Sequence, residues 1–328
     1  GNCDVRIDYR IMQFFLLINN LLSRNRPTSH LSITQYSIVP LTKNSGLISW
    51  VENAKSLHQI ISMFPKNRAK EQELIDQNFA DFTNTMNSTQ LLELYRTIAD
   101  GGKIEPELAG DDIDQFIWLK ATTSSVWIKN NHTFVSSSAL MSIAGYIVGL
   151  GDRHPNNILM QNHSGKVAHI DFGDVFEITM TRDNYPEKVP FRLTRMIVNA
   201  FDGSNPFGIF ERTCDDVLGL IREAKQTIMA QFELFTDDTT IANNPKFEGA
   251  KITERVKEKL DGTDYNLIVE EVFTNENNLK NDNNNNLDDS TENKVKALSV
   301  ESQVRALIEK AIDPNRYATH WIGWRSYW

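Results

Sequence analysis

The sequence predicts an α+β fold in which a small strand-bearing portion precedes a mostly helical body. Two β-rich runs surround a Gly-containing loop within residues 31–51, which is the signature of a β-hairpin. From Ser56 onward the spacing of apolar residues becomes helical, with one short β-like island at 158–172. Because strands and helices do not alternate along the chain, this pattern favours α+β over a βαβ series.

The N-terminal elements follow from local signals. Residues 9–24 are dense in Phe, Leu, Ile and Met, and they predict a helix that Arg26-Pro27 ends. Residues 31–41 and 47–51 are the two arms of the hairpin, with a turn at 44–46. The helices expected after the hairpin cover residues 56–64, 89–99, 111–120, 137–149, 192–201 and 214–235.

The last quarter of the chain is polar at first. It contains one amphipathic helix over 252–260, for which Gly262 is the expected C-cap. Residues 275–286 hold eight Asn in twelve positions, and such a segment cannot bury a core, so it is predicted to be disordered. Order is expected to resume in a helix over 299–312.

Composition limits the classes of function. The chain has 43 acidic and 34 basic residues, and its net charge of −9 argues against nucleic-acid binding. Two cysteines exclude a disulfide scaffold and a Cys-rich zinc site, and they suit a reducing compartment. The longest apolar stretch, 11–22, is too short to span a bilayer, and no secretory signal pattern is present. We therefore expect a cytoplasmic location, and the start at Gly1 suggests a fragment of a longer protein.

Two segments carry the strongest functional signal, GLGDRHPNN at 149–157 and HIDFG at 169–173. Phosphoryl transfer needs a carboxylate to accept the proton of the substrate hydroxyl, and an amide oxygen and a second carboxylate to hold Mg²⁺ against ATP. Asp152 precedes Asn157 by five residues, which is the spacing of the base and the metal-binding Asn in protein kinases, and Asp171 opens an Asp-Phe-Gly. The alternative is that Asp152 and Asn157 only cap turns, but the joint occurrence favours a kinase.

The order of the first triplet departs from the usual His-Arg-Asp, because it reads Asp152-Arg153-His154. His154 therefore lies on the metal side of the base, where it could stabilise the charge that develops on the transferring phosphoryl group. The alternative is a loop histidine with ordinary hydrogen bonds.

The segments GLGDRHPNNILM and HIDFGDVFE resemble the phosphatidylinositol-3-kinase-related protein kinases. NSGLISWV, PEKVPFRLTRM and the terminal WIGWRSYW are similar to the target-of-rapamycin (TOR) branch of that family, and the resemblance covers about residues 1–235 and 297–328. It implies an atypical (PI3/PI4-kinase-like) Ser/Thr kinase that uses ATP and Mg²⁺ (or Mn²⁺), with a C-terminal FATC segment packed on the catalytic lobe.

The resemblance also implies a division of the chain. The expected domains are a partial N-lobe and hinge at 1–51, a C-lobe at 52–235, a polar linker at 236–296 and the FATC segment at 297–328. Within the C-lobe, the expected functional segments are an insertion at 62–110, a catalytic loop at 149–159 and an activation loop at 171–192.

The family's functional residues are carried over one position at a time. The resemblance makes Asp152 the catalytic base with His154 beside it, and Asn157 and Asp171 the metal ligands. The other residues that it places around the nucleotide are Asp8, Tyr36, Ile48, Trp50, Val51, Leu159 and Ile170. The Val51 backbone would bond the adenine edge, and Trp50 would stack on the ring. Without the resemblance, Tyr36, Leu159 and Ile170 could equally be ordinary core residues.

Some departures from the family affect these expectations. The Gly-rich loop and the ATP-binding Lys would lie upstream of residue 1, so the chain by itself is expected to be inactive. Cys3 replaces an acidic residue of the helix that pairs with that Lys, and the pair would then use Asp4 or Asp8, or would be weakened. The FATC segment lacks the family's redox cysteines, so disulfide switching is not expected.

Two alternatives to a Ser/Thr protein kinase remain open. A phosphoinositide lipid kinase would need a basic activation loop, whereas residues 174–190 hold four acidic and two basic side chains. A non-catalytic pseudokinase scaffold would typically have lost the base or a metal ligand, whereas Asp152, Asn157 and Asp171 are all present.

The resemblance also implies partners, namely protein substrates and large scaffold subunits. In TOR kinases the segment equivalent to 62–110 docks a WD-repeat propeller subunit, and the alternative is that this polar segment is a solvated pair of surface helices. The C-terminal aromatic cluster looks exposed, and one interpretation is transient membrane contact, peripheral on endomembranes. The favoured interpretation is packing against the catalytic lobe. The cluster consists of Trp321, Ile322, Trp324, Tyr327 and Trp328.

Overall fold

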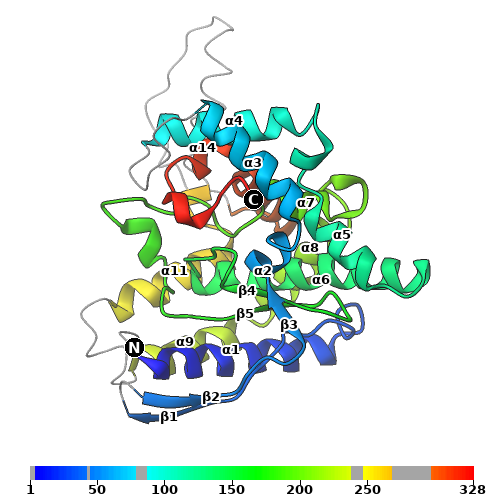
Figure 1. Ribbon diagram of the computed structural model, residues 1–328. Coiled ribbons are helices and arrows are strands. Elements are labelled where there is room, and N and C mark those ends of the chain that lie inside the picture. Colours follow the sequence, from blue (N-terminus) through cyan, green and yellow to red (C-terminus); the bar gives the residue numbers. More distant parts are fainter. Residues whose placement is uncertain (1–3, 43–44, 79–86, 238–246, 268–296) are drawn as a thin grey trace, which may run out of the picture.

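The computed structural model describes residues 4–42, 45–78, 87–237, 247–267 and 297–328, and Figure 1 shows that helices dominate. The predicted α+β class is confirmed. The helices are α1 (Val5–Arg24), α2 (Leu57–Ile61), α3 (Pro65–Asn78), α4 (Ser88–Gly101), α5 (Asp112–Lys120), α6 (Ser124–Val148), α7 (Arg195–Asn199), α8 (Ile209–Glu223), α9 (Lys225–Asp237), α11 (Gly249–Asp261), α13 (Val300–Ile312) and α14 (Pro314–Tyr317). The strands and 3-10 helices are β1 (Ile38–Thr42), β2 (Ser45–Ile48), β3 (Ala54–Ser56), β4 (Ile158–Gln161), β5 (Val167–His169), η1 (Pro106–Leu108), η2 (Ile178–Thr181), η3 (Asp202–Ser204) and η4 (Ile322–Trp324).

The predicted N-terminal helix is α1. It begins before the predicted residue 9, because Asp4 caps it by accepting a hydrogen bond from the Arg6 backbone N–H at 3.1 Å. One face of α1 buries seven apolar side chains, among them Phe14 and Phe15. Each fully buried side chain of this kind contributes about 1.5–3 kcal/mol. This packing fixes α1 along its length, beside the β1–β2 hairpin in Figure 1.

The predicted hairpin is present but shorter than its sequence pattern. β1 pairs antiparallel with β2, and Ile38 lies opposite Ile48, so residues 31–37 precede the strand. The expected turn includes residue 44, which lies outside the described part of the chain. Most apolar side chains of this hairpin are exposed.

A second sheet has the strand order β3-β4-β5. β4 and β5 form the predicted island at 158–172, with Ile158 opposite His169. The sequence does not predict β3, which has only three residues and pairs with β4 through Ser56 opposite Leu159. This sheet holds the residues that follow the predicted hinge beside the end of the predicted catalytic loop.

Two helix predictions differ most from the structure. α6 begins at Ser124, far before the predicted residue 137, because Thr123 caps it with its side chain. Its first turns carry Ser, Lys, Asn and His, which hide the helical periodicity. The single helix expected over 214–235 is split between α8 and α9 at Ala224. The break has no Pro or Gly, and it lets α9 pack against α11 while α8 packs against α6 and α13.

The helices of the C-terminal quarter agree with their sequence signals. α11 ends at Gly262, whose φ of 71° is the left-handed conformation expected of a C-cap. α13 begins after Ser299, which caps it. The Asn-rich segment predicted to be disordered lies outside the described residues. None of the helices in the described ranges has the length and apolar character needed to cross a membrane.

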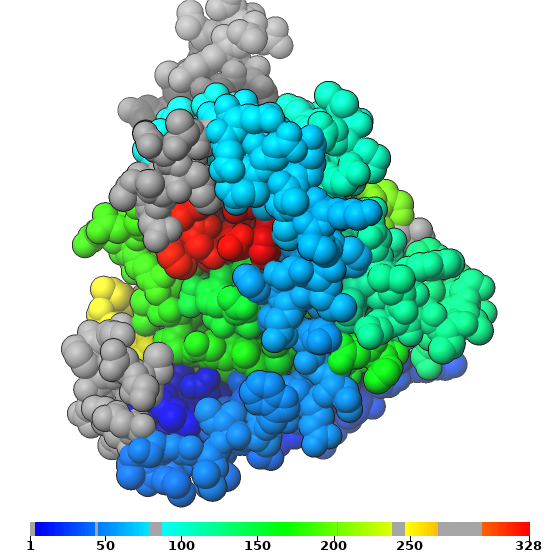
Figure 2. Space-filling view, viewed as in Figure 1, coloured from blue at the N-terminus to red at the C-terminus, as the bar shows by residue number. Residues whose placement is uncertain are grey.

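The C-terminal aromatic cluster is mostly buried, which agrees with the favoured interpretation that it packs against the rest of the chain, and only Trp321 has the exposure of the alternative. Ile322, Trp324, Tyr327 and Trp328 are at most 7% exposed, whereas Trp321 is 47% exposed. Trp328 Nε1 donates to Glu71 Oε1 of α3 at 2.8 Å, and Arg68 and Arg325 lie over the Trp328 ring. Figure 2 shows this red segment between the α3–α4 region and the central part of the chain.

Candidate active site

The predicted catalytic loop begins at a tight junction with α6. Gly149 ends α6 with a φ of 60°, and a Cβ there would lie 2.6 Å from the backbone N of Glu177. A Cβ on Gly151 would lie 2.0 Å from the hydroxyl of Thr179. Only glycine fits at these two positions, so the loop packs directly against the predicted activation loop.

Asp152, the predicted base, has a strained backbone that a buried side chain supports. Its φ of 56° is left-handed, which costs a non-glycine residue about 1–3 kcal/mol. Its backbone N–H donates to Glu187 Oε2 at 2.8 Å. Burial raises the pKa of Glu187 to about 7, although the hydrogen bond from Asp152 opposes this shift. Glu187 therefore holds the base in its conformation, a role that sequence reasoning missed.

His154 and Asn157 lie beside the base. Asn157 Nδ2 donates to the Asp152 carbonyl at 2.9 Å, and within the described ranges no donor is bonded to its Oδ1. His154 Nδ1 accepts from the Asn156 backbone N–H at 3.2 Å, and Nε2 lies 3.9 Å from Asp152 Oδ2. Burial and the charge of Arg153 lower the pKa of His154 against the opposing charge of Asp152. The neutral ring therefore carries its proton on Nε2, which faces Asp152.

Arg153 connects the catalytic loop to the Asp-Phe-Gly segment. Its guanidinium donates to the carbonyls of Gly151 at 2.7 Å, Ile170 at 2.9 Å and Asp171 at 2.5 Å. It also lies over the Phe172 ring, 5.8 Å from the centroid. Asp171 has a φ of 61°, so the predicted base and the predicted metal ligand are both left-handed. Burial lowers the pKa of Arg153, yet a guanidinium stays charged at neutral pH and can hold these carbonyls together.

A cavity of about 630 Å³ lies between α1, the hairpin and the second sheet. All seven residues predicted to surround the nucleotide line it, together with one predicted metal ligand; they are Asp8, Tyr36, Ile48, Trp50, Val51, Leu159, Ile170 and Asp171. Trp50 is 85% exposed, so the outer wall is open. Asp152, His154 and Asn157 do not line it, but Asn156, the neighbour of Asn157, does. The structure therefore brings these residues together, while their roles toward a nucleotide stay predictions.

Asp8, rather than Asp4, reaches this cavity. Asp4 caps α1 and pairs with Arg6 at 2.6 Å. Asp8 Oδ1 accepts the backbone N–H of Phe172 at 3.0 Å, which ties α1 to the Asp-Phe-Gly segment. Burial raises the pKa of Asp8, and the charge of Asp171 acts in the same direction. Cys3 lies outside the described residues.

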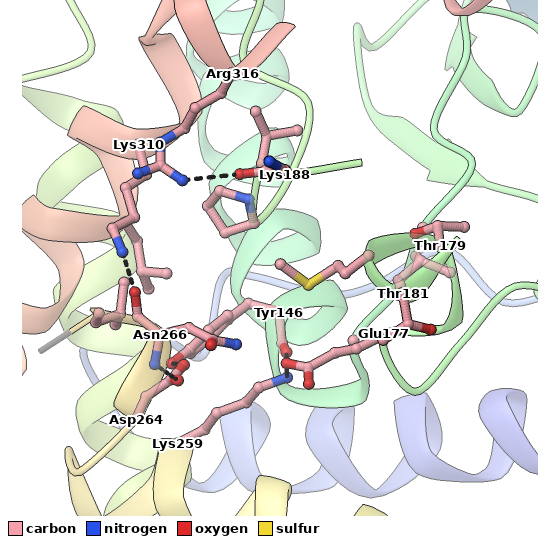
Figure 3. Close-up of a pocket in the computed structure, with 18 of the residues that line it drawn as sticks. Tyr146, Glu177, Thr179, Thr181, Lys188, Lys259, Asp264, Asn266, Lys310 and Arg316 are labelled. Atoms are coloured by element: carbon pink, nitrogen blue, oxygen red, sulfur yellow. Dashed lines mark hydrogen bonds and ion pairs between the residues drawn. The ribbon is translucent and has the colours of Figure 1, made fainter. Parts of the chain in front are cut away.

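The start of the activation loop is clamped by helix α11. Lys259 is 2% exposed, and its Nζ lies 2.8 Å from Glu177 Oε1. Arg255 Nε bonds the other Glu177 oxygen at 2.9 Å, and its NH2 reaches Asp264 at 2.9 Å. Burial acts to raise the pKa of Glu177, but these two cations outweigh it and bring the pKa to about 2. Figure 3 shows Glu177, Lys259 and Asp264 on the floor of a second pocket.

The acidic side chains of this loop are largely used within the fold. Asp174 is bonded to Arg182 at 2.8 Å, Glu187 is buried, and Glu177 belongs to the α11 clamp. The net negative charge that the sequence places on the loop is therefore not presented as a repulsive surface. Loop charge gives less discrimination between protein and lipid substrates than the sequence suggested.

Two arginines, one at the end of the predicted activation loop and one just after it, hold the C-terminal segment. The buried Arg192 donates to the carbonyls of Trp324 at 2.8 Å and Arg325 at 2.8 Å, and its guanidinium lies 4.3 Å from the Trp324 ring centroid. Arg195 donates to the Tyr327 carbonyl at 2.7 Å. The C-terminal segment therefore supports the part of the chain that carries Glu187. Sequence reasoning missed both arginines, and their only signal is the FRLTR run.

The sequence and the fold are both similar to those of known proteins. The phosphatidylinositol 3- and 4-kinase family matches residues 1–244, and the FATC domain matches residues 297–328. The "Serine/threonine-protein kinase TOR" of Oryza sativa subsp. japonica is 40% identical over 74% of this chain and 10% of its own length. The "Target of rapamycin homolog" of Caenorhabditis elegans is 34% identical over 100% of this chain and 12% of its own length.

Solved structures agree with these matches. The "FAT and kinase domain of CtTel1" has a TM-score of 0.70 and 25% identity over 100% of this chain and 21% of that one. The resemblance to TOR kinases drawn from the sequence motifs is thus confirmed. The chain spans about a tenth of the length of the curated relatives it matches.

Proposed function

Since this chain belongs to the phosphatidylinositol 3- and 4-kinase family and carries a FATC domain, we propose that it is the catalytic portion of a protein kinase that transfers the γ-phosphate of ATP to Ser or Thr side chains. One observation carries this proposal. The 630 Å³ cavity gathers the residues that the sequence assigned to the nucleotide, and Arg153 ties Asp171 at that cavity to the loop of the base.

The donor set suits Mg²⁺. Asp171 offers a carboxylate, and the amide oxygen of Asn157 is left available by the hydrogen bond that its Nδ2 donates. No cluster of three or more His, Cys, Asp or Glu side chains suited to a metal occurs in the described ranges. Two protein ligands are typical of Mg²⁺ that is held jointly with substrate phosphates, so Asp171 and Asn157 would hold the ion, which would neutralise phosphate charge.

The chain's own residues supply the remaining chemistry. The Asp152 carboxylate accepts the proton of the substrate hydroxyl, while Glu187 keeps its backbone in place. His154, neutral with its proton on Nε2, donates toward the negative charge that develops on the transferred group. The apolar cavity walls and the exposed Trp50 bind the adenine ring of ATP.

Calorimetric titration of the purified protein with ATP and MgCl₂ tests the site. We expect Asp171→Ala to abolish the Mg²⁺-dependent part of ATP affinity, whereas Asp183→Ala, an exposed acid of the same loop, leaves it unchanged. Equal affinities of the wild type and Asp171→Ala for MgATP would overturn the proposed metal role.

A second assay, made on the full-length protein because this chain by itself is expected to be inactive, separates the alternatives for the substrate. We expect Asp152→Asn to abolish phosphate transfer to a protein mixture, and we expect no transfer to phosphoinositide vesicles by the wild type. Robust headgroup phosphorylation would favour the lipid kinase, and binding of MgATP without any transfer would favour the scaffold.

The proposal includes a cytoplasmic location, large scaffold partners and a WD-repeat subunit at 62–110, for which co-purification is the test.

A further inference from the structure

A third cavity, with a volume of about 810 Å³, lies outside the candidate active site. We call it the α6–α8 cavity, because the first half of α6 and the first turns of α8 form two of its walls. The segment that follows α1, at 27–32, and the end of the turn between β4 and β5 contribute the other sides. The residues that line this cavity are all different from those that line the nucleotide cavity, and they lie outside the predicted catalytic and activation loops.

Basic side chains outnumber acidic ones in the α6–α8 cavity. Lys129, Lys166 and Arg212 line it, and Asp216 is the one acidic residue among the described residues that do so. Three positive charges against one negative charge leave an excess of +2 when the lining histidines are neutral. The cavity is therefore positive on a chain whose net charge is −9, and its field attracts anions.

Two of these cations are available to a ligand. Within the described part of the chain, the side chains of Lys129 and Arg212 form no hydrogen bond and no ion pair, and both residues are exposed. Asp216 lies one turn after Arg212 on α8 and is likewise unpaired in that part of the chain. It reduces the positive potential of the cavity, but it does not occupy either cation.

The third cation, Lys166, is half-buried and has only a neutral partner. Its Nζ donates to the hydroxyl oxygen of Ser32 at 2.7 Å. Burial lowers the pKa of Lys166, and among the described residues no carboxylate acts against this shift. An ammonium group that has lost water without gaining a counter-ion is stabilised by an arriving anion.

Hydroxyl and imidazole groups surround the three cations. Ser125, Ser136 and Thr213 line the cavity together with His30 and His132. Hydroxyls donate hydrogen bonds to anionic oxygens, and each histidine adds a positive charge when it is protonated. Lys, Arg and hydroxyl donors together are suited to phosphate oxygens, which accept several hydrogen bonds at once.

The size of the cavity favours a ligand with more than one phosphate group. Its volume is in the range of sites for whole organic ligands, and the three cations come from α6, α8 and the β4–β5 turn. One phosphate ion would fill only a small part of this space. We propose that the α6–α8 cavity binds a small molecule that carries two or more phosphate groups, which Lys129, Lys166 and Arg212 hold. This binding does not rest on the proposed kinase function.

Calorimetry with sodium tripolyphosphate, in the absence of Mg²⁺, tests the binding. We expect tripolyphosphate to bind at least about tenfold more tightly than inorganic phosphate, because only the longer anion reaches cations on more than one wall. The double variant Lys129→Gln/Arg212→Gln should weaken tripolyphosphate binding by about tenfold or more. The matched control Arg96→Gln/Lys257→Gln removes two exposed charges elsewhere and should bind as the wild type does. Equal affinities of the double variant and the wild type, or no binding to the wild type, would overturn the proposal.

Hydrogen exchange of the wild type locates the ligand without any substitution. Tripolyphosphate should slow amide exchange in residues 125–137 and 209–216, which carry the two helical walls of the cavity. Unchanged exchange in both segments would contradict the proposed site, even if tripolyphosphate bound elsewhere.

Vesicle sedimentation distinguishes two sources of such a ligand. Phosphatidylcholine vesicles that contain phosphatidylinositol 4,5-bisphosphate present phosphate groups on a lipid headgroup. Sedimentation of the wild type but not of Lys129→Gln/Arg212→Gln would assign a lipid headgroup to the cavity. Tripolyphosphate binding without sedimentation would assign a soluble ligand, and failure of both would exclude the site.

Discussion

The hairpin with the hinge and the C-terminal segment are both rich in aromatic and aliphatic side chains, but they differ in burial. Val39, Leu41, Leu47 and Trp50 are all more than half exposed, whereas Trp324 and Trp328 are 3% exposed. The difference lies in the polar groups nearby. Arg192, Arg195 and Glu71 bind the carbonyls and one indole N–H of the C-terminal segment, so its rings can leave water without orphaned backbone groups.

The largest expected effect is at the C-terminal end. Trp328→Ala removes a buried ring that packs on His58 and two arginines and that bonds Glu71. We expect the free energy of unfolding to fall by about 3–5 kcal/mol, the range for large-to-small changes at buried aromatic sites. Denaturant unfolding measures it.

Trp321→Ala is the matched control, since this ring belongs to the same segment but is half exposed. It should change the free energy of unfolding by less than about 1 kcal/mol. Equal losses for the two variants would show that the segment is held by something other than ring burial.

Arg192→Met tests whether buried hydrogen-bond donors to the C-terminal carbonyls are needed for the burial of the rings. The variant keeps the aliphatic stem but leaves the Trp324 and Arg325 carbonyls without their buried donor. We expect a loss of about 2–4 kcal/mol, because each unsatisfied buried group costs about 1–3 kcal/mol. Arg305→Met, an exposed arginine on α13, should stay within about 0.5 kcal/mol of the wild type. A stable Arg192→Met protein would mean that the rings alone drive burial.

Elements that depend on local signals were predicted from the sequence, whereas elements that depend on distant parts of the chain were not. Local signals predicted α11 and α13, namely the Gly262 C-cap and the apolar periodicity of residues 300–311, because both act within a few turns of a helix. β3 and the α8–α9 break depend on distant partners, so no local pattern reveals them.

At the candidate site, the burial of three cationic side chains is the main feature that the sequence did not predict. The predicted nucleotide residues do meet at one cavity, because the family motifs were matched one position at a time. Arg153, Arg192 and Lys259 are buried cations that organise the loops, but their sequence is indistinguishable from that of solvated surface cations. Their role depends on carbonyls and carboxylates brought from elsewhere in the chain.

A smaller effect on the free energy of unfolding is expected when the pH is lowered, because of a buried histidine in the C-terminal segment. His320 is buried against Trp324, and burial lowers its pKa to about 3. Between pH 6.5 and 3 the unfolded chain therefore binds more protons than the folded one, and stability falls as pH falls through this window. The slope approaches 1.4 kcal/mol per pH unit. His320→Phe should reduce the difference between the unfolding free energies at pH 7.5 and 5.5, and an unchanged difference would assign the acid sensitivity to other groups.

The smallest effect on stability is expected at the hinge. Trp50 is 85% exposed, so Trp50→Ala should change the free energy of unfolding by less than about 0.5 kcal/mol. The same change should weaken MgATP binding by up to about tenfold, because ring stacking contributes about 0.5–1.5 kcal/mol. Calorimetry and denaturant unfolding on one preparation separate the two outcomes, with Leu41→Ala as an exposed control away from the cavity. Reduced stability with unchanged MgATP affinity would mean that Trp50 serves the fold rather than a ligand. Exposure of the hinge side chains would then no longer indicate a binding role that the buried C-terminal rings lack.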